Sequence, residues 1–362
     1  MTASILGIGT AVPEFSIEQT DAAEQVSQLC GASAPQQPAL KALYRRCGVV
    51  KRHSVLLKSS TNGKPAEQEF YRQGDNSQLG PTTAERMKVY EGAAAPLAIE
   101  ASLRALSDAE VKPEVITDLV TVSCSGFFAP GVDLALVVEL GLRPTASRTH
   151  IGFMGCQGAL NGLRVAKAFS ESRGDARVLC CAVELCSLHH QFDGRPDQIV
   201  ANALFADGAA AVVVGRASQP TTPWQLVDVR STVIPDSLEY LSWQIKDHGF
   251  QMTLSPQLPA LIDQALRISL EPWLREHNLG IEEIGSWAIH PGGSRIVESC
   301  ARAVAADPQS VADSQQVLAE FGNMSSPTVL FILDRLRRRN AARPCVALAF
   351  GPGVAVEAAL FR

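Results

Sequence analysis

One layout of strand and helix occurs twice along the chain, and this repeat restricts the fold more than any other feature of the sequence. In the first copy, a strand-like run ends around Cys124, and 32 residues later Cys156 stands at the start of a helical pattern. In the second copy, a strand-like run ends around His290, and a helical pattern starts 33 residues later at Asn323. In both copies another strand follows 22 residues further on. The spacing predicts one unit used twice, with halves packed about a pseudo-two-fold axis that brings Cys156, Asn323 and His290 together.

Strand-like and helical segments alternate along the whole chain, which is typical of an α/β fold. The strand-like runs cover residues 3–11, 118–126, 148–155, 177–185, 208–215, 224–233, 285–293, 344–353 and 353–361. We expect the polar stretch 57–80 to be a loop, and the stretch 216–224 to link the two halves. The sequence therefore predicts an N-terminal half over residues 1–220 and a C-terminal half over residues 221–362.

The composition is that of an ordinary globular protein rather than a nucleic-acid-binding or membrane protein. Hydrophobic residues make up 46% of the 362 residues, charged residues 19%, and the formal net charge is −5, without an overall basic bias. The first residues lack a basic start followed by a long apolar core, and no apolar run reaches the ~18 residues of a membrane-spanning helix. We expect a cytosolic protein.

The nine cysteines are odd in number, and Cys124, Cys180, Cys181 and Cys345 lie in apolar strand-like runs. This usage favours reduced core thiols over a disulfide framework. No paired CxxC spacing occurs, and His189-His190 has no second ligand cluster, so we expect no metal site. The stretch GIGTAV near the N-terminus lacks the third glycine of a dinucleotide fingerprint.

Cys156 stands directly before a helix with one apolar face. Ala159, Leu163, Ala166 and Phe169 recur at spacings of three and four residues, which predicts an amphipathic helix. Unpaired N–H groups and the helix dipole favour negative charge at such a position and lower thiol pKa values. Cys156 is therefore a candidate nucleophile in its thiolate form, with an inert buried thiol as the alternative.

His290 and Asn323 supply the groups that a cysteine-based acyl transfer requires. A neighbouring imidazole stabilises a thiolate, and an Asn amide can donate to a developing oxyanion. Each residue also has a structural alternative: Asn323 could cap the helix that follows it, and His290 could hydrogen-bond to the Pro-Gly-Gly turn after it. The matched spacing in the two halves favours the catalytic interpretation.

The chain resembles the type III polyketide synthases, the chalcone and stilbene synthase-like family of thiolase-fold condensing enzymes. The resemblance covers nearly the whole chain, and it rests on the blocks IGFMGCQGALNGLRVAKAF, ALFADGAAAVVVG, AIHPGGSRIV, FGNMSSPTVLFILDRL and AFGPG in this order. It implies a thiolase-like fold with duplicated mixed-sheet αβαβα layers.

The resemblance also implies the reaction. Cys156 matches the acyl-carrying nucleophile of the family, and His290 and Asn323 match its catalytic His and Asn. An acyl-CoA starter loads onto Cys156, malonyl-CoA is decarboxylated beside His290 and Asn323, and repeated condensation is followed by cyclisation. CoA thioesters are the substrates, and no redox cofactor or metal is required.

Several further residues match positions that line the family's substrate tunnel. Phe205 matches the conserved gatekeeper aromatic, and the second gatekeeper falls at Met252, with Phe250 as a neighbouring candidate. The other tunnel positions are Cys124, Cys186, His189, Trp243 and Ser325. The pattern is closest to bacterial members that make alkylpyrones or alkylresorcinols from long acyl-CoA starters. The bulky His189 and Trp243 could instead shorten the pocket for a small or aromatic starter.

The family is homodimeric, and a loop before a proline crosses into the partner's cavity. FFAPGVD matches this loop and places Ala129 at the crossing residue, with Ala129-Pro130 as a candidate cis bond and an ordinary surface turn as the alternative. For CoA phosphates the resemblance points to Arg45 and Arg46, and Arg295 is a second candidate at the CoA mouth. The same basic stretch also contains Lys41, Lys51 and Arg52, and it could be only a solvated helix face.

Two other functions are compatible with these residues. A ketoacyl-ACP synthase also uses Cys, His and Asn but performs one condensation on a carrier protein. A non-catalytic or redox-sensing paralogue would keep the fold and use the cysteines for oxidation chemistry. The starter, the number of extensions and the mode of ring closure do not follow from the sequence.

Overall fold

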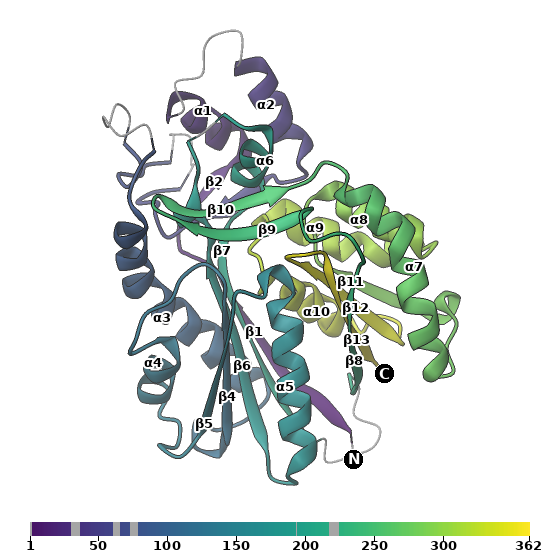
Figure 1. Ribbon diagram of the computed structural model, residues 1–362. Coiled ribbons are helices and arrows are strands. Elements are labelled where there is room, and N and C mark those ends of the chain that lie inside the picture. Colours follow the sequence, from purple (N-terminus) through teal and green to yellow (C-terminus); the bar gives the residue numbers. More distant parts are fainter. Residues whose placement is uncertain (1, 30–36, 61–65, 73–78, 193, 217–223) are drawn as a thin grey trace.

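The computed structural model describes residues 2–29, 37–60, 66–72, 79–192, 194–216 and 224–362. Within these residues the chain forms two mixed sheets, with a layer of helices between them and further helices on both outer faces (Figure 1). The predicted linker falls largely outside the described residues, as does part of the predicted loop. The described parts of 57–80 contain no helix and no strand beyond an isolated bridge between Leu57 and Gln68.

The N-terminal sheet has the strand order β1-β7-β6-β4-β5. Its strands are β1 (Ala3–Ala11), β7 (Asp207–Arg216), β6 (Arg177–Leu185), β4 (Asp118–Ser123) and β5 (Ser147–Gly152). The pairs β1–β7 and β7–β6 are antiparallel, whereas β6–β4 and β4–β5 are parallel. The central strands are buried on both faces, which explains their continuous apolar sequences.

The C-terminal sheet repeats this arrangement with the order β8-β13-β12-β11. Its strands are β8 (Leu226–Val233), β13 (Ala355–Phe361), β12 (Cys345–Gly351) and β11 (Ser286–Ile289). The pairs β8–β13 and β13–β12 are antiparallel, and β12–β11 is parallel, as in β1-β7-β6-β4. The structure therefore contains the duplicated unit that the spacing predicts.

The middle layer consists of α5 (Gly158–Ser172) and α10 (Thr328–Arg338), one helix from each half. Their apolar side chains share one core with inward-facing residues of both sheets, among them Leu163, Leu333, Val212 and Ala347. Alternate residues of the sheets face outward instead, where α3 (Thr83–Asp108) covers the first sheet and α7 (Leu258–Glu276) and α8 (Ser294–Ala303) cover the second. The helices and sheets thus stack in alternating layers.

The glycines of the GIGT stretch serve packing rather than nucleotide binding. β1 lies directly against α3, and a Cβ atom placed on Gly9 would come within 2.2 Å of the Ala101 carbonyl oxygen. Gly7 approaches the end of the same helix, where a Cβ atom would lie 2.4 Å from the Ala109 nitrogen. A side chain at either position would push the strand off the helix.

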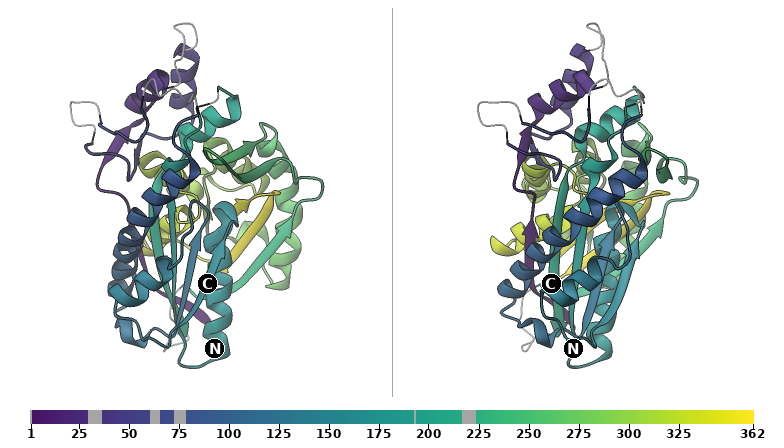
Figure 2. Two further views of the ribbon diagram at one scale, coloured as in Figure 1. Left: turned by 60° about the vertical axis from the view of Figure 1, so that its left-hand side comes forward. Right: turned by 90° about the vertical axis from the view of Figure 1, so that its left-hand side faces the viewer.

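Elements that the strand pattern did not indicate lie at the end of the molecule opposite the two termini (Figure 2). They are β2 (Ser16–Glu18), α1 (Gln19–Leu29), α2 (Gln37–Arg46), β3 (Lys51–His53), α6 (Pro196–Leu204) and the hairpin of β9 (Leu241–Lys246) and β10 (Gly249–Leu254). The remaining helices are α4 (Val132–Glu139) and α9 (Ala312–Phe321), with single 3-10 turns η1 (Pro113–Val115), η2 (Gly155–Gln157), η3 (Cys186–His189), η4 (Ile281–Glu283) and η5 (Pro308–Val311).

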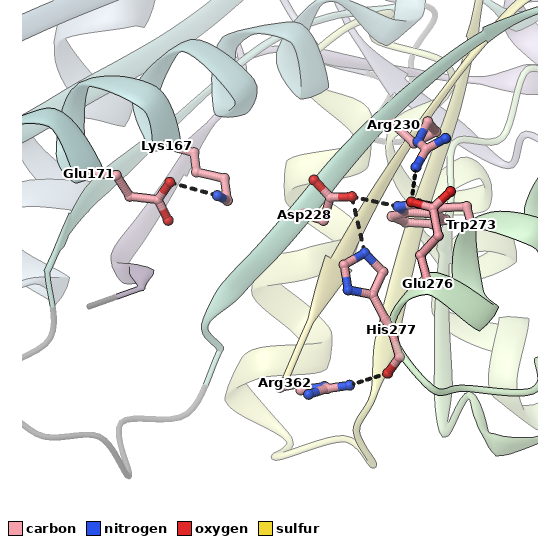
Figure 3. A network of polar contacts seen from close by, with 8 residues as sticks. All are labelled: Lys167, Glu171, Asp228, Arg230, Trp273, Glu276, His277 and Arg362. Atoms are coloured by element: carbon pink, nitrogen blue, oxygen red, sulfur yellow. Dashed lines mark hydrogen bonds and ion pairs between the residues drawn. The ribbon is translucent and has the colours of Figure 1, made fainter.

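A polar network fastens α7 to the edge strand β8 (Figure 3). Asp228 accepts hydrogen bonds from Trp273 Nε1 at 2.7 Å and from His277 Nε2 at 3.1 Å. Arg362 donates to the His277 carbonyl at 2.8 Å, so the last residue of the chain is tied to the same helix end. This network belongs to the C-terminal half of the chain.

Candidate active site

Cys156 lies in the short turn η2, between β5 and α5. The turn depends on Gly155, which has a φ of 69° and on which a Cβ atom would lie 2.4 Å from Pro352 Cδ. Cys156 is half-buried and carries a free thiol. The prediction that this cysteine stands at the start of a helix is therefore confirmed, with one 3-10 turn before α5 begins.

Asn323 lies in a turn that bridges the two halves of the molecule. Its backbone N–H donates to the Leu204 carbonyl at 2.8 Å, and its carbonyl accepts from the Ala206 N–H at 2.9 Å. The helix α10 begins only at Thr328, and its N-cap residue Pro327 makes no side-chain hydrogen bond to it. The alternative that Asn323 caps this helix is therefore wrong. Its Oδ1 accepts from the Ser325 N–H at 2.8 Å instead.

His290 follows β11, and its imidazole is buried with an exposed fraction of 1%. Neither ring nitrogen has a hydrogen-bond partner among the described residues. The alternative that the ring is bonded to its own turn is therefore wrong. Buried polar atoms without a partner are uncommon in folded proteins, so the ring nitrogens of His290 have the capacity to bond to a substrate.

Cys156, His290 and Asn323 line one cavity, which we call the His290 cavity. The Asn323 and Ser325 side chains line cavities shared with the Cys156 thiol. Leu204 and Phe205 close the cavity on the side of α6. The constellation that the spacing predicts is present, and the catalytic roles of its members stay predictions.

Burial keeps the thiol and the imidazole neutral. It raises the pKa of Cys156 to about 11, against the hydrogen bonds from Ser325 and Asn323 that act to lower it. Burial also lowers the pKa of His290 to about 3. The expectation of a lowered thiol pKa at the helix start is wrong, because the loss of water around the sulfur outweighs the effect of the helix terminus.

A second cavity, the central chamber, extends from the other side of Cys156. It is lined by Cys124, Ser125, Gly155, Cys156, Glu184, Cys186, Phe205, Leu241, Ser242, Trp243, Met252, Ser325 and Pro352. The tunnel positions expected from the resemblance thus meet here, with two exceptions, Ala129 and His189. Of the two candidates for the second gatekeeper, Met252 lines the chamber and Phe250 does not.

Glu184 is a member of the chamber wall that the sequence reasoning missed. It is fully buried in β6 and accepts hydrogen bonds from the N–H groups of Cys124 and Ser125 and from the hydroxyls of Ser125 and Ser326. Burial raises its pKa, and these hydrogen bonds oppose the shift. The signal was present in the sequence, because Glu184 is the single acidic residue in the apolar run RVLCCAVEL.

A third cavity, the outer gallery, lies beyond the chamber. Cys186, Phe205, Trp243 and Met252 line both cavities and form the partition between them. The gallery has a volume of about 110 Å³, compared with about 40 Å³ for the chamber. Its wall on the side of α1 is formed by Ala22, Gln25, Val26 and Leu29.

His189 stands behind the partition rather than in the chamber. Its ring stacks on Phe250 with centroids 4.2 Å apart and meets the edge of Trp243 at 5.4 Å. Trp243 is held in turn by a hydrogen bond of 2.8 Å from its Nε1 to the Cys124 carbonyl. His189 therefore does not line the chamber itself but contacts Trp243, which does.

Ala129 is exposed and lines none of the three cavities of its own chain. It lies in the loop between β4 and α4, and the Ala129-Pro130 bond is cis as expected. The same loop exposes Phe127, whose ring contacts those of Phe153 and Phe250.

The candidate CoA residues Arg45, Arg46 and Arg295 are all exposed. Arg45 and Arg46 end α2, and Arg295 lies in the first turn of α8. The two sites adjoin, because Gly48 packs against Ser294. In contrast, Arg52 is buried and donates to the carbonyls of Asn202 at 2.5 Å and Phe205 at 3.1 Å.

The layered mixed sheets, with a thiol at the start of the central helix α5, define a thiolase-fold protein. The N-terminal domain model of the chalcone and stilbene synthases matches residues 1–219, and the C-terminal domain model of the same family matches residues 225–362. The chain belongs to this family and is a type III polyketide synthase, an acyltransferase that performs decarboxylative condensations on CoA thioesters. The family and the fold class expected from the resemblance are therefore confirmed, and the alternatives of a carrier-protein synthase and a non-catalytic paralogue are not supported.

Similar proteins cover nearly the same length. An alpha-pyrone synthesis polyketide synthase-like protein, Pks18 of Mycobacterium tuberculosis, is 33% identical over 99% of this chain and 91% of its own. A 1,3,6,8-tetrahydroxynaphthalene synthase of Streptomyces peucetius is 33% identical over 99% and 93%. The crystal structure of PKS-I from the brown alga Ectocarpus siliculosus superposes with a TM-score of 0.93 at 31% identity, covering 100% of this chain and 98% of that one.

No helix in the described part of the chain is both long and apolar enough to cross a membrane.

Proposed function

We propose that Cys156 carries the growing acyl chain, that His290 and Asn323 activate malonyl-CoA, and that the product is an alkylpyrone or alkylresorcinol. The observation that carries the catalytic part is the His290 cavity, where a thiol, an amide and an imidazole without hydrogen-bond partners face one space. The proposal for the product rests on the outer gallery.

In the loading step His290 acts as a base. The neutral imidazole accepts the Cys156 proton as the sulfur attacks the carbonyl carbon of the acyl-CoA thioester. The developing oxyanion accepts a hydrogen bond from the Asn323 amide. The C–S bond to CoA then breaks, and the imidazolium returns the proton to the leaving CoA thiolate. Because the pKa of His290 is low, the imidazolium gives up this proton readily.

In the extension step His290 and Asn323 act as hydrogen-bond donors. The thioester oxygen of malonyl-CoA accepts from one ring N–H of His290 and from the Asn323 amide, so that loss of CO2 leaves a stabilised enolate. The enolate carbon attacks the Cys156 thioester, and the Cys156 sulfur leaves as a thiolate. The extended chain is then a CoA thioester and reloads onto Cys156 for the next round.

A long alkyl starter is supported by the space beyond the partition. The central chamber is the smaller cavity, so a chain that outgrows it has its nearest space in the gallery along α1. Three of the four side chains that bound it there are aliphatic, and burial of a methylene group against such a surface is favourable by about 0.8 kcal/mol. The name of Pks18 connects this relative with alpha-pyrone synthesis. A small or aromatic starter is the alternative if Trp243 keeps the gallery closed.

The proposal includes a homodimer and a CoA site at Arg45, Arg46 and Arg295. The strand β5 is the edge of its sheet and exposes much of its length, so a second copy could pair with it or cover it. The neighbouring loop exposes Phe127 and Ala129 on the same side of the molecule as β5. For CoA, the guanidinium groups of α2 and α8 suit bidentate contacts with phosphate.

The experiment is incubation with malonyl-CoA and a series of acyl-CoA starters, from acetyl to long-chain, with products identified by mass. We expect the highest kcat/KM for long-chain starters and products with several two-carbon extensions. Rejection of long chains would contradict the product class while leaving the catalytic roles intact. The Cys156→Ala variant, as control, should form no product from any starter.

A further inference from the structure

The first turn of α3 contains a buried arginine that takes no part in the proposed reaction. Arg86 has an exposed fraction of 0%, and no carboxylate of the described residues lies within salt-bridge distance of it. Its guanidinium lies 5.5 Å from the centroid of the Tyr71 ring. Placing a cation in the interior without a counter-ion is costly, so its retention requires a specific set of contacts.

These contacts are three main-chain carbonyls, two of which flank His189. Arg86 Nη1 donates to the Leu188 carbonyl at 2.6 Å and to the His190 carbonyl at 3.0 Å, and Arg86 Nε donates to the Pro81 carbonyl at 2.8 Å. One planar group therefore fixes the backbone on both sides of His189. The hydroxyl of Tyr71, which Nη1 also contacts, donates to the Ser187 carbonyl at 2.7 Å.

With its backbone fixed, His189 is held in one orientation. Its Nε2 lies 2.6 Å from the Ser125 carbonyl and must carry the proton, and its Nδ1 accepts from the Phe250 N–H at 2.9 Å. Burial lowers the pKa of His189 to about 3, so the ring is neutral in this arrangement. The stacked Phe250 and the edge-on Trp243 complete a rigid aromatic wall behind the central chamber.

The same turn of α3 also holds the hairpin that carries Trp243 and Phe250. The Thr83 N–H donates to the Asp247 carbonyl at 2.7 Å, and Thr83 Oγ1 accepts from the Gly249 N–H at 2.8 Å and donates to the Lys246 carbonyl. Arg86 packs directly beneath Gly249, where a Cβ atom would lie 2.7 Å from Nη1. α3 thus hydrogen-bonds both to the backbone beside His189 and to the hairpin of β9 and β10, the two segments that form the aromatic wall.

We propose that Arg86, assisted by Thr83, is a positioning residue for chain length: it holds the wall of His189, Phe250 and Trp243 that limits how far an acyl chain extends from Cys156. The inference rests on the proposed function, because the wall selects chains only if Cys156 carries them. It assigns Arg86 no contact with the reacting atoms. Loss of the Arg86 hydrogen bonds should therefore change which acyl chains are accepted more than it changes the chemistry at His290 and Asn323.

The test compares Arg86→Gln with Lys88→Gln. Both substitutions remove one positive charge from α3, and Lys88 is exposed. We expect the ratio of kcat/KM between two acyl-CoA starters that differ by two carbons to fall by about tenfold in Arg86→Gln, the scale of discrimination by a well-fitted apolar pocket, and to stay unchanged in Lys88→Gln. Arg86→Lys, which keeps the charge but loses the planar fork, should also lose selectivity.

Decarboxylation of malonyl-CoA in the absence of a starter separates positioning from loss of structure. This rate depends on His290 and Asn323, and we expect it to stay within about twofold in the Arg86 variants. A parallel fall of decarboxylation and of activity with every starter would overturn the proposal, as would an unchanged starter ratio in a folded variant. If Arg86→Gln does not fold, Thr83→Val decides, because it removes the two Oγ1 hydrogen bonds to the hairpin and leaves Arg86 in place: a shifted ratio supports the proposal and an unchanged ratio rejects it. Failure of the proposed function would show separately, as product formation by Cys156→Ala.

Discussion

At the scale of single residues, burial decides the resting state of Cys156 and His290. The thiol has a pKa of about 11 and the imidazole a pKa of about 3, so at neutral pH both are uncharged. An ion pair between them would have to form as the substrate arrives. His290 suits this exchange because its ring nitrogens have no other partner among the described residues.

We predict that iodoacetamide modifies Cys156 faster than Cys124, Cys180 or Cys345. Cys156 is half-buried, whereas the other three are buried and burial raises their pKa values too. Because alkylation requires the thiolate, the rate at Cys156 should rise about tenfold per pH unit between about pH 7 and pH 9. Peptide mapping by mass spectrometry resolves the sites, with Cys156→Ser as control. A rate that levels off below pH 8 would show a thiolate formed in the empty site, which contradicts a raised pKa of Cys156.

At the scale of secondary-structure elements, Asp228 joins α7 to β8 through Trp273 and His277 (Figure 3). Partial burial acts to raise the pKa of Asp228, but the hydrogen bonds from Trp273 and His277 outweigh it and the pKa is lowered. A carboxyl whose pKa is lower in the folded than in the unfolded chain contributes stability above its unfolded pKa. That contribution is lost as the pH falls through the folded pKa.

We predict that Asp228→Asn lowers the free energy of unfolding by about 1 kcal/mol at neutral pH, the typical net value of a hydrogen bond. The difference from the wild type should shrink below about pH 4, where the unfolded carboxyl is already protonated. Urea unfolding across this pH range measures both effects. Glu276→Gln is the matched control, because the pair of Glu276 with Arg230 is exposed and should contribute little. An Asp228→Asn effect that stays constant down to pH 3 would contradict the assignment.

At the scale of the whole molecule, the exposed side of β5 and its neighbouring loop is the surface proposed to meet a second copy. Phe127 has an exposed fraction of 53% although it belongs to the aromatic group of Phe153 and Phe250. Phe250 in turn stacks on His189 in the aromatic wall behind the central chamber, so the proposed interface adjoins the substrate site.

We predict that the wild type sediments as a dimer and that Phe127→Asp raises the dissociation constant by more than about tenfold, because a charge would be buried at the interface. Sedimentation velocity at several concentrations measures this change. Ile268→Asp is the control, since Ile268 is 74% exposed on α7, away from β5. A monomeric wild type, or an equal effect of both substitutions, would reject this interface.

Local patterns were sufficient to predict the strands of both sheets and the helices of the middle layer, but not the outer helices α3, α7 and α8. Each apolar strand-like run became a strand, and the apolar face after Cys156 became α5, because strand and helix periodicity are properties of neighbouring residues. The short strands β2 and β3 and the hairpin of β9 and β10 were not predicted. They are amphipathic or polar, and they form through contacts with distant segments such as Thr83 with Asp247.

The sequence by itself determined the duplicated fold, the family and the meeting of Cys156, His290 and Asn323, because these follow from spacing and from blocks of adjacent residues. Only the tertiary structure decided the protonation states, the place of Asn323 in a turn rather than at a helix cap, and the hydrogen bonds of Arg86 to the backbone beside His189. These features depend on burial and on contacts between residues far apart in the chain. Arg86 and the Leu188 carbonyl are separated by 102 residues, and no local sequence pattern predicts the hydrogen bond between them.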